Sequence, residues 1–142
     1  MQDRFKFRVW EKDQKIMKEC TQITLDKDQT GSMCDVKGKV TAHLVYQPHY
    51  ILMQCTGKKD KHNKLIYEGD IVRLTGKNKV TFEYLVKYRL SEYRYVLEYA
   101  NGKFKGRKAR DFSKEYAQVK NLYDGGYEVI GNIYENPELL EG

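Results

Sequence analysis

Five cationic side chains fall within eight positions in the second half of the chain, in the segment KFKGRKAR. Phe104 lies inside this segment, and Gly102 and Gly106 allow its backbone to bend. Cations at this density can follow a phosphate backbone, and the Phe104 ring can stack on an exposed base. The pattern predicts a loop that binds nucleic acid; the alternative is a solvated hairpin tip whose charge prevents aggregation at a sheet edge. The cations are Lys103, Lys105, Arg107, Lys108 and Arg110.

Two alternating segments precede this loop and must position it. Residues 80–90 and 93–99 alternate between apolar and polar side chains, which is typical of two antiparallel β-strands. The polar face carries Lys87, Arg89 and Arg94, which we expect to extend the basic surface of the loop. Tyrosines share the other face with aliphatic side chains, so we expect them in a core; the alternative is a stacking platform for bases. These tyrosines are Tyr84, Tyr88, Tyr93, Tyr95 and Tyr99.

The rest of the chain predicts further strands and one helix. Alternating or paired apolar residues indicate strands at residues 5–10, 16–25, 40–46 and 129–133. Residues 26–39 are rich in Asp, Gly, Lys and Ser, which predicts a long irregular loop or a loose hairpin. An apolar period close to 3.6 over residues 111–124 indicates an amphipathic helix, which the pair Gly125–Gly126 ends.

No group of residues has the spacing of a catalytic or metal-binding site. Glu68 and Asp70 lie two apart and can hold a hard cation, but acids around Gly69 are also common in turns. Cys55 and His62 can form a nucleophile and base, but a cysteine in an apolar strand is more typical of a packed thiol. We therefore predict no catalytic residues, no metal, no cofactor and no enzymatic activity.

Composition limits the setting in which the protein acts. The chain has 142 residues, which suits one domain or two small packed subdomains, and its net charge of +6 permits an anionic partner. Its three cysteines are odd in number and widely spaced, which indicates reduced thiols. No apolar segment approaches the roughly 20 residues of a membrane span, and the first residues do not form an apolar signal segment. These features predict a cytoplasmic protein without membrane contact.

Three segments carry a family resemblance. LMQCTGKKDKHNKLIYEGDIV, from Leu52 to Val72, closely resembles the signature of the YopX family of phage and prophage proteins. FKFRVWEKDQKIM near the start and YEVIGNIYENPELL near the end resemble the opening and closing segments of that family. Cys55 stands where an aromatic residue is expected in relatives, which weakens a functional interpretation of this thiol. The resemblance implies a protein made from a phage genome inside a bacterial host cell; it implies no activity.

These observations predict an α+β fold that is mostly antiparallel β. Residues 1–62 form an N-terminal β-rich subdomain in this prediction, and residues 63–142 form a small SH3-like barrel with one helix. The first functional hypothesis is a non-enzymatic phage or prophage accessory protein that binds nucleic acid through the basic loop. The alternative is a protein-interaction or self-assembly module, whose partner is a phage protein, a host protein or a second copy of the chain.

Overall fold

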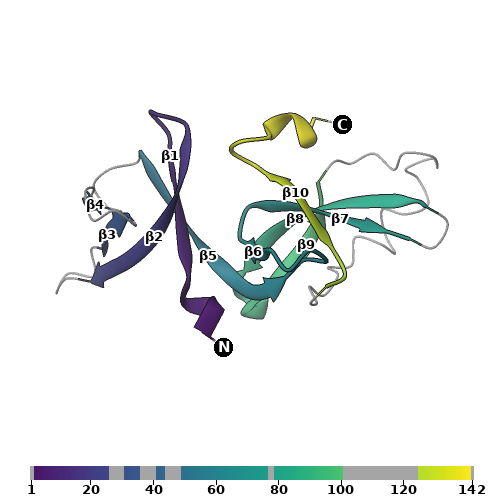
Figure 1. Ribbon diagram of the computed structural model, residues 1–142, viewed down its shortest axis with the longest axis horizontal. Helices are drawn as coiled ribbons and strands as arrows, with labels where there is room; N and C mark the ends of the chain where they lie inside the picture. The colour runs from purple at the N-terminus through teal and green to yellow at the C-terminus, as the bar shows by residue number, and fades with distance from the viewer. Residues whose placement is uncertain are drawn as a thin grey trace.

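The computed structural model describes residues 2–25, 31–35, 41–43, 49–76, 79–100 and 125–141. In these residues the chain forms two sheets in which all paired strands are antiparallel (Figure 1). The first sheet has the order β4-β3-β2-β1-β5-β6 and the second has the order β10-β7-β8-β9. The prediction of a mostly antiparallel β protein is therefore confirmed.

Six strands form the first sheet: β1 (Phe7–Glu11), β2 (Ile16–Leu25), β3 (Gly31–Asp35), β4 (Thr41–His43), β5 (Tyr50–Lys59) and β6 (Leu65–Tyr67). Four strands form the second: β7 (Asp70–Thr75), β8 (Thr81–Arg89), β9 (Arg94–Tyr99) and β10 (Glu128–Asn132). Short 3-10 helices occupy η1 (Gln2–Phe5), η2 (Leu90–Glu92) and η3 (Pro137–Leu139). Strand β3 lies within residues 26–39 and pairs with both β2 and β4, which agrees with the hairpin alternative for that segment and not with an irregular loop.

Strand β5 changes partners along its length, because its two halves have different neighbours within the first sheet. Residues 50–54 pair with β1, and the second half pairs with β6 through Cys55 and Lys59. Between these pairs Gly57 has a φ of +78°, a conformation that glycine adopts without steric cost. The strand therefore runs from the first sheet toward the second (Figure 1). The chain enters the second sheet at Gly69, whose φ of +81° confirms the corner that the sequence predicts there.

The second sheet curls around an apolar core, as half of a barrel does. Its fully buried members come from β6, β7, β8, β9 and the residue before β10, and they are Ile66, Val72, Tyr84, Val86, Leu97 and Tyr127. The ring centroids of Tyr84 and Tyr99 lie 5.0 Å apart, and the Tyr127 ring meets Tyr84 edge to face at 6.3 Å. Tyr84 and Tyr99 pack in or against the core as predicted, and Tyr127 is a further member that the sequence did not indicate. The closed SH3-like barrel and the division near residue 62 stay predictions.

The expectation that all tyrosines of β8 and β9 pack in the core is wrong at the hairpin tip. Tyr88 is 42% exposed and Tyr93 is 80% exposed, and Leu90 between them is 72% exposed. Alternation places Tyr88 on the same face as the buried Val86, but the hairpin extends past the core, so nothing in the described residues covers its tip. Side chains on this face of β8 are therefore buried as far as Val86 and exposed from Tyr88 on, although apolar and polar residues continue to alternate.

Two predicted elements lie outside the described residues. They are the basic loop with Lys103, Phe104, Lys105, Arg107, Lys108 and Arg110, and the helix expected over residues 111–124. No helix among the residues that the structure describes has the length and apolar character needed to cross a membrane.

Candidate nucleic-acid interface

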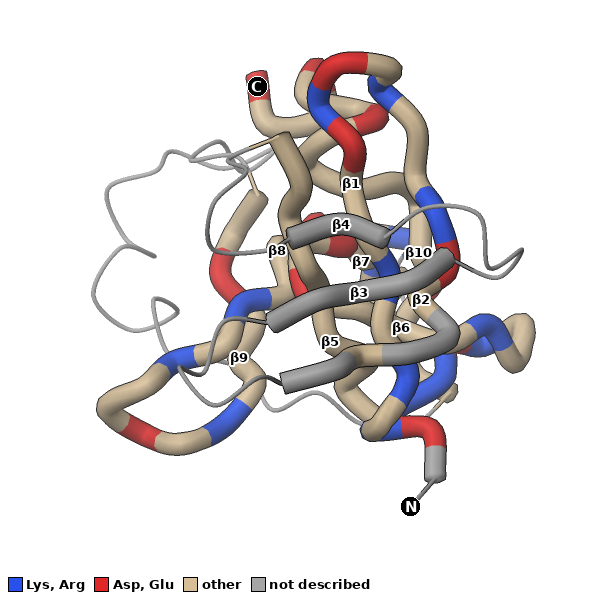
Figure 2. The backbone as a smooth tube through the Cα atoms, turned by 90° about the vertical axis from the view of Figure 1, so that its left-hand side faces the viewer, with Lys and Arg blue, Asp and Glu red and all other residues tan. Residues whose placement is uncertain are grey.

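The three cations predicted on the β8–β9 hairpin pair with two carboxylates. The Lys87 Nζ atom lies 2.7 Å from Glu98, and Arg89 contacts both Glu92 at 2.6 Å and Glu98 at 3.4 Å. The Nε atom of Arg94 donates to Glu92 at 2.6 Å. Figure 2 shows the hairpin projecting from the other strands, with an acidic segment between two basic ones at its tip. This network neutralises part of the positive charge that the sequence suggested for this face.

The pKa values of the two acids follow from these contacts. The hydrogen bond from Arg89, followed by that from Arg94, lowers the pKa of Glu92. The hydrogen bond from Lys87 is the largest influence on Glu98 and lowers its pKa against the effect of burial. Both acids therefore stay ionised at neutral pH and hold their cations in place.

The predicted basic loop begins at the other end of β9. Ala100 is the last described residue before it, and its backbone N–H donates to the Glu83 carbonyl oxygen at 3.0 Å. The register of the hairpin pairs Tyr84 with Tyr99 at this end and Arg89 with Arg94 at the tip. Six strand residues span roughly 17 Å. The structure thus separates the start of the loop from Arg89 and Arg94 by the length of β9, whereas Lys87 lies opposite Val96 midway along the strand.

A different set of cations and tyrosines meets at the hairpin tip. A pocket of about 500 Å³ lies between β5, η1 and the β8–β9 hairpin. We call it the cationic pocket, and its lining residues are Arg4, Thr56, Gly57, Lys58, Tyr88, Tyr93, Arg94 and Tyr95. Three of these residues are cations, three are tyrosines and none is acidic. Of the hairpin cations that the sequence predicted, this pocket contains Arg94 alone.

Gly57 brings Arg4 into the cationic pocket. A Cβ atom at Gly57 would lie 2.5 Å from Cγ of Arg4, so only glycine lets the arginine cross the β5 strand at this point. The Gln54 side chain fixes the same segment, because its Nε2 donates to the Arg4 carbonyl oxygen at 2.8 Å. The Arg4 guanidinium makes no ion pair with any residue that the structure describes, so its charge is available to a ligand.

The three tyrosines present both ring faces and ring edges. The rings of Tyr88 and Tyr95 meet edge to face with centroids 5.2 Å apart. Tyr93 has a φ of 52° in the left-handed region, which is uncommon for a bulky residue, and this conformation directs its ring to solvent. Burial, reinforced by the negative charge of Glu68, raises the pKa of Tyr95 to about 12. Tyr95 is therefore uncharged at neutral pH and does not repel an anionic ligand.

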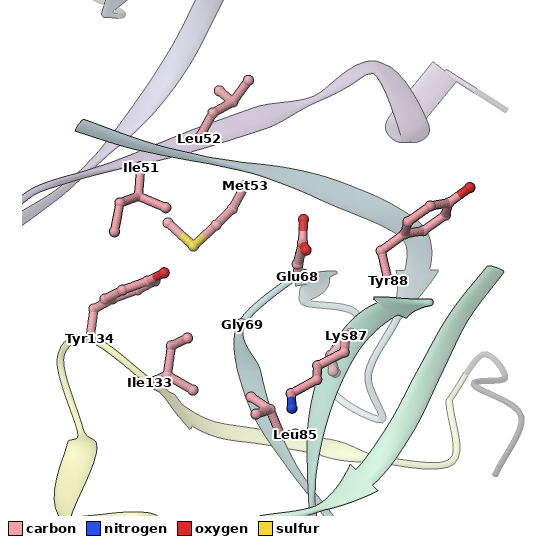
Figure 3. A pocket seen from close by; sticks show the side chains of 11 residues that line it. Ile51, Leu52, Met53, Glu68, Gly69, Leu85, Lys87, Tyr88, Ile133 and Tyr134 are labelled. Atoms are coloured by element: carbon pink, nitrogen blue, oxygen red, sulfur yellow. The ribbon is translucent and has the colours of Figure 1, made fainter. Parts of the chain in front are cut away.

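A second pocket of about 300 Å³ lies between the sheets (Figure 3). Residues 51–53 of β5 form one wall, residues 85–88 of β8 form the other, and Ile133 and Tyr134 close one side. We call it the inter-sheet pocket. Its charged lining residues are Glu68 and Lys87, and burial raises the pKa of the Glu68 carboxyl. Tyr88 lines both this pocket and the cationic pocket, so the two are adjacent.

Beside this pocket, Arg8 of β1 forms a buried ion pair with Asp70 of β7. The Arg8 Nη2 atom lies 2.7 Å from Asp70 Oδ1, and the two side chains are 13% and 1% exposed. Arg8 also donates to the Glu68 carbonyl oxygen at 3.2 Å and lies over the Tyr67 ring at 4.8 Å. Burial raises the pKa of Asp70, and the charge of Arg8 opposes this effect. Asp70 therefore links the two sheets and does not join Glu68 in a cation site.

The remaining chemical candidates from the sequence have structural partners. Cys55 is fully buried, and burial raises the pKa of its thiol, which confirms the packed thiol. His62 contacts Glu128 at 3.3 Å. Asp60 is buried and accepts from the backbone N–H groups of His62, Lys64 and Val129 at 2.8, 2.8 and 3.1 Å, so it ties the charged turn to β10. Among the described residues, no three His, Cys, Asp or Glu side chains cluster as metal ligands do.

The fold and the two pockets define a mostly antiparallel protein of two sheets, which has a cation-rich pocket at a hairpin tip. The chain belongs to the YopX family, because the family model for YopX protein matches residues 6–141. The resemblance seen in the three sequence segments is thus confirmed. No match is found among curated proteins.

Two solved structures share the fold. Protein EF1440 from Enterococcus faecalis is 27% identical, with a TM-score of 0.56 over 95% of this chain and 96% of that chain. YopX from Bacillus subtilis is 21% identical, with a TM-score of 0.58 over 98% of each chain. Both likenesses extend over nearly the whole chain, so the two-sheet arrangement is common to all three proteins. No activity is assigned to the family or to these two neighbours.

Proposed function

We propose that this protein is a non-enzymatic module that binds single-stranded nucleic acid. The observation that carries the proposal is the cationic pocket, where Arg4, Lys58 and Arg94 line the same space as exposed tyrosine rings and none of the lining residues is acidic. Proteins that bind single strands combine cations along the backbone with aromatic rings on which bases stack. The net charge of +6 adds long-range attraction for a polyanion.

The proposal moves the interface from the predicted loop to the hairpin tip. Lys87 and Arg89 support the site from outside, because their ion pairs with Glu92 and Glu98 hold the hairpin that presents Tyr93. The loop of residues 103–110 stays a predicted second contact for the same strand. The family resemblance adds the setting, the cytoplasm of a bacterium that carries a phage or prophage.

Fluorescence anisotropy with a labelled eight-nucleotide deoxythymidine strand, titrated at several salt concentrations, tests the proposal. The Arg4→Ala variant should bind more weakly and show a salt dependence smaller by about 0.7 in log–log slope, because one phosphate contact is lost. Lys12→Ala is the matched control, since Lys12 is an exposed cation in the β1–β2 turn, away from the pocket. An unchanged affinity for Arg4→Ala, or an equal loss for Lys12→Ala, would refute the site.

Removal of the Tyr93 ring tests stacking separately. The Tyr93→Asn variant is preferable to alanine, because asparagine tolerates the left-handed conformation and the hairpin keeps its shape. Stacking on one aromatic ring contributes about 1–3 kcal/mol per base, so we expect a loss of about fivefold or more in affinity. A variant that binds as well as the wild type would show that no base stacks on Tyr93.

A second function, protein interaction or self-assembly, is favoured by one observation. Leu90 and Tyr93 expose apolar surface side by side at the tip, and such side chains are frequent at protein interfaces. This function predicts a stable oligomer or complex with weak dependence on salt. Light scattering coupled to size-exclusion chromatography distinguishes the two functions: a monomer that stays monomeric at high concentration contradicts self-assembly through this tip.

A further inference from the structure

We propose that the inter-sheet pocket accepts one unstacked guanine base of the bound strand and that Glu68 recognises its hydrogen-bonding edge. The inference rests on the proposed function, because the base must come from a strand held on the cationic pocket. It goes further in assigning base preference to a carboxylate outside that pocket.

The first support is the unused acceptor capacity of Glu68. An ionised carboxylate has two oxygens, both of which accept hydrogen bonds. In the part of the chain that the structure describes, the Glu68 side chain has no hydrogen-bond or ion-pair partner. Lys87 is the other charged group of the pocket, and it is bound to Glu98 at 2.7 Å. The pocket therefore offers two acceptor atoms on an apolar wall that no described side chain engages.

The second support is the shape and chemistry of the walls. Met53 and Ile51 of β5 face Leu85 of β8 across the pocket, and Ile133 and Tyr134 close it (Figure 3). A volume of about 300 Å³ is at the lower limit for small-ligand pockets and suits one flat ring system. Apolar walls stack on the faces of a planar ring, while a single polar group at the end sets the orientation of its edge.

The third support is the position of Tyr88. Its side chain lines both pockets, so a strand with phosphates near Arg4, Lys58 and Arg94 passes the entrance of the inter-sheet pocket. One base can then turn past Tyr88 toward the Glu68 carboxyl, which Figure 3 shows pointing toward β5. Extrusion of a base from a single strand needs no base-pair opening and has a low energetic cost.

The carboxylate distinguishes the four bases by the number of adjacent hydrogen-bond donors that each base presents. The Watson–Crick edge of guanine presents adjacent N1–H and N2–H donors, which match the two oxygens of one carboxylate. Adenine and cytosine present one amino donor next to a ring nitrogen acceptor, and thymine presents one N–H between two carbonyl oxygens; these acceptors repel the second carboxylate oxygen. Guanine is therefore the base that satisfies both oxygens of Glu68.

The test compares two labelled strands, eight thymidines and the same strand with one central guanosine, against the full-length protein by fluorescence anisotropy. The guanosine strand should bind about tenfold more tightly, which is within the range for a bidentate side chain–base contact. Replacement of the guanosine by inosine removes the N2 amino group and should abolish most of this preference.

The Glu68→Gln variant should lose the preference for guanosine and keep its affinity for the thymidine strand. Glu141→Gln is the control, because it makes the same change of charge at an exposed position near the end of the chain. A thymidine strand that binds without a guanosine preference, or a preference that survives in Glu68→Gln, overturns this inference and leaves the proposed function in place. If neither strand binds, both are overturned.

Discussion

The ion pair between Arg8 and Asp70 gives the sharpest prediction about how the two sheets are held together. The Arg8→Leu variant keeps an apolar side chain in place of the aliphatic stem and removes the guanidinium. Asp70 is 1% exposed and would keep its charge without a partner, and loss of one member of a buried pair costs about 3–5 kcal/mol. The variant should therefore lose about this much of its free energy of unfolding.

Urea denaturation followed by tryptophan fluorescence is the appropriate assay. Trp10 is the only tryptophan of the chain, is 7% exposed, and stacks on Tyr134 with ring centroids 5.7 Å apart. It therefore reports the junction at which the pair lies. The matched control is Arg73→Leu, which breaks a more exposed ion pair with Glu83 at 2.8 Å and should cost about 1 kcal/mol or less.

The double variant Arg8→Leu with Asp70→Leu separates a missing partner from lost packing. If the cost of the single variant arises from an isolated buried charge, the double variant should recover most of it. A loss below about 1 kcal/mol in Arg8→Leu, or a double variant no more stable than either single one, would refute the idea that this pair couples the sheets.

The pH dependence of Arg8→Leu follows from the same charge. Burial already raises the pKa of Asp70, and without Arg8 nothing in the pair opposes that effect. An acid with a higher pKa in the folded state takes up a proton on folding, so the folded state is favoured at low pH. The deficit of Arg8→Leu relative to the wild type should be smallest near pH 4 and should grow as the pH rises toward 7.

Three further predictions concern other parts of the fold. Asp60→Ala should cost about 2 kcal/mol at pH 7 in urea denaturation, because three backbone donors lose their acceptor. Burial raises the pKa of Asp60, but the hydrogen bonds from these backbone N–H groups lower it by more, so the pKa lies below its ordinary value. The stability deficit of the variant should therefore vanish as the pH falls below that pKa. Gly69→Ala should cost about 1–2 kcal/mol by the same assay because its φ is +81°; an unchanged stability would contradict the strained corner. Glu98→Gln should remove the ionic partner of Lys87 and one of the two partners of Arg89, so the hairpin that presents Tyr93 should be held less firmly and anisotropy should show weaker binding of single strands. Tighter binding with a steeper salt dependence would instead place these two cations in the interface.

The sequence predicted those features that depend on neighbours along the chain. The β8–β9 hairpin follows from alternation, the corner at Gly69 follows from turn chemistry, and the packed thiol of Cys55 follows from its apolar strand. Alternation assigns a side chain to one face of a strand but does not say where the covering layer ends. Alternation for this reason predicts that Tyr88 and Tyr93 lie in the core, although they are exposed at the tip.

The candidate site depends on residues far apart in the sequence, and pattern analysis missed these. Arg4 meets Tyr93 in one pocket only because β5 changes neighbours at Gly57 and brings the start of the chain to the hairpin. Similarly, Asp70 and Glu68 look like a local acidic pair until Arg8, from another sheet, takes Asp70 as its partner. The sequence signal for the contact of Arg4 was Gly57, a glycine that directly precedes two lysines.

The pairing of β5 with β1 in its first half and with β6 in its second half also determines what happens when the chain is cleaved between β5 and β6. A cut in the exposed turn at residues 61–64 leaves β5 on one fragment and its partner β6 on the other. The first fragment then lacks β6 and the Asp70 partner of Arg8, whereas the second keeps all four strands of the second sheet and its core. We expect the second fragment to fold alone and the first to need the second in order to fold. A pair of such fragments should therefore behave as a complementation system, in which recovery of Trp10 fluorescence reports that two separately expressed pieces have met.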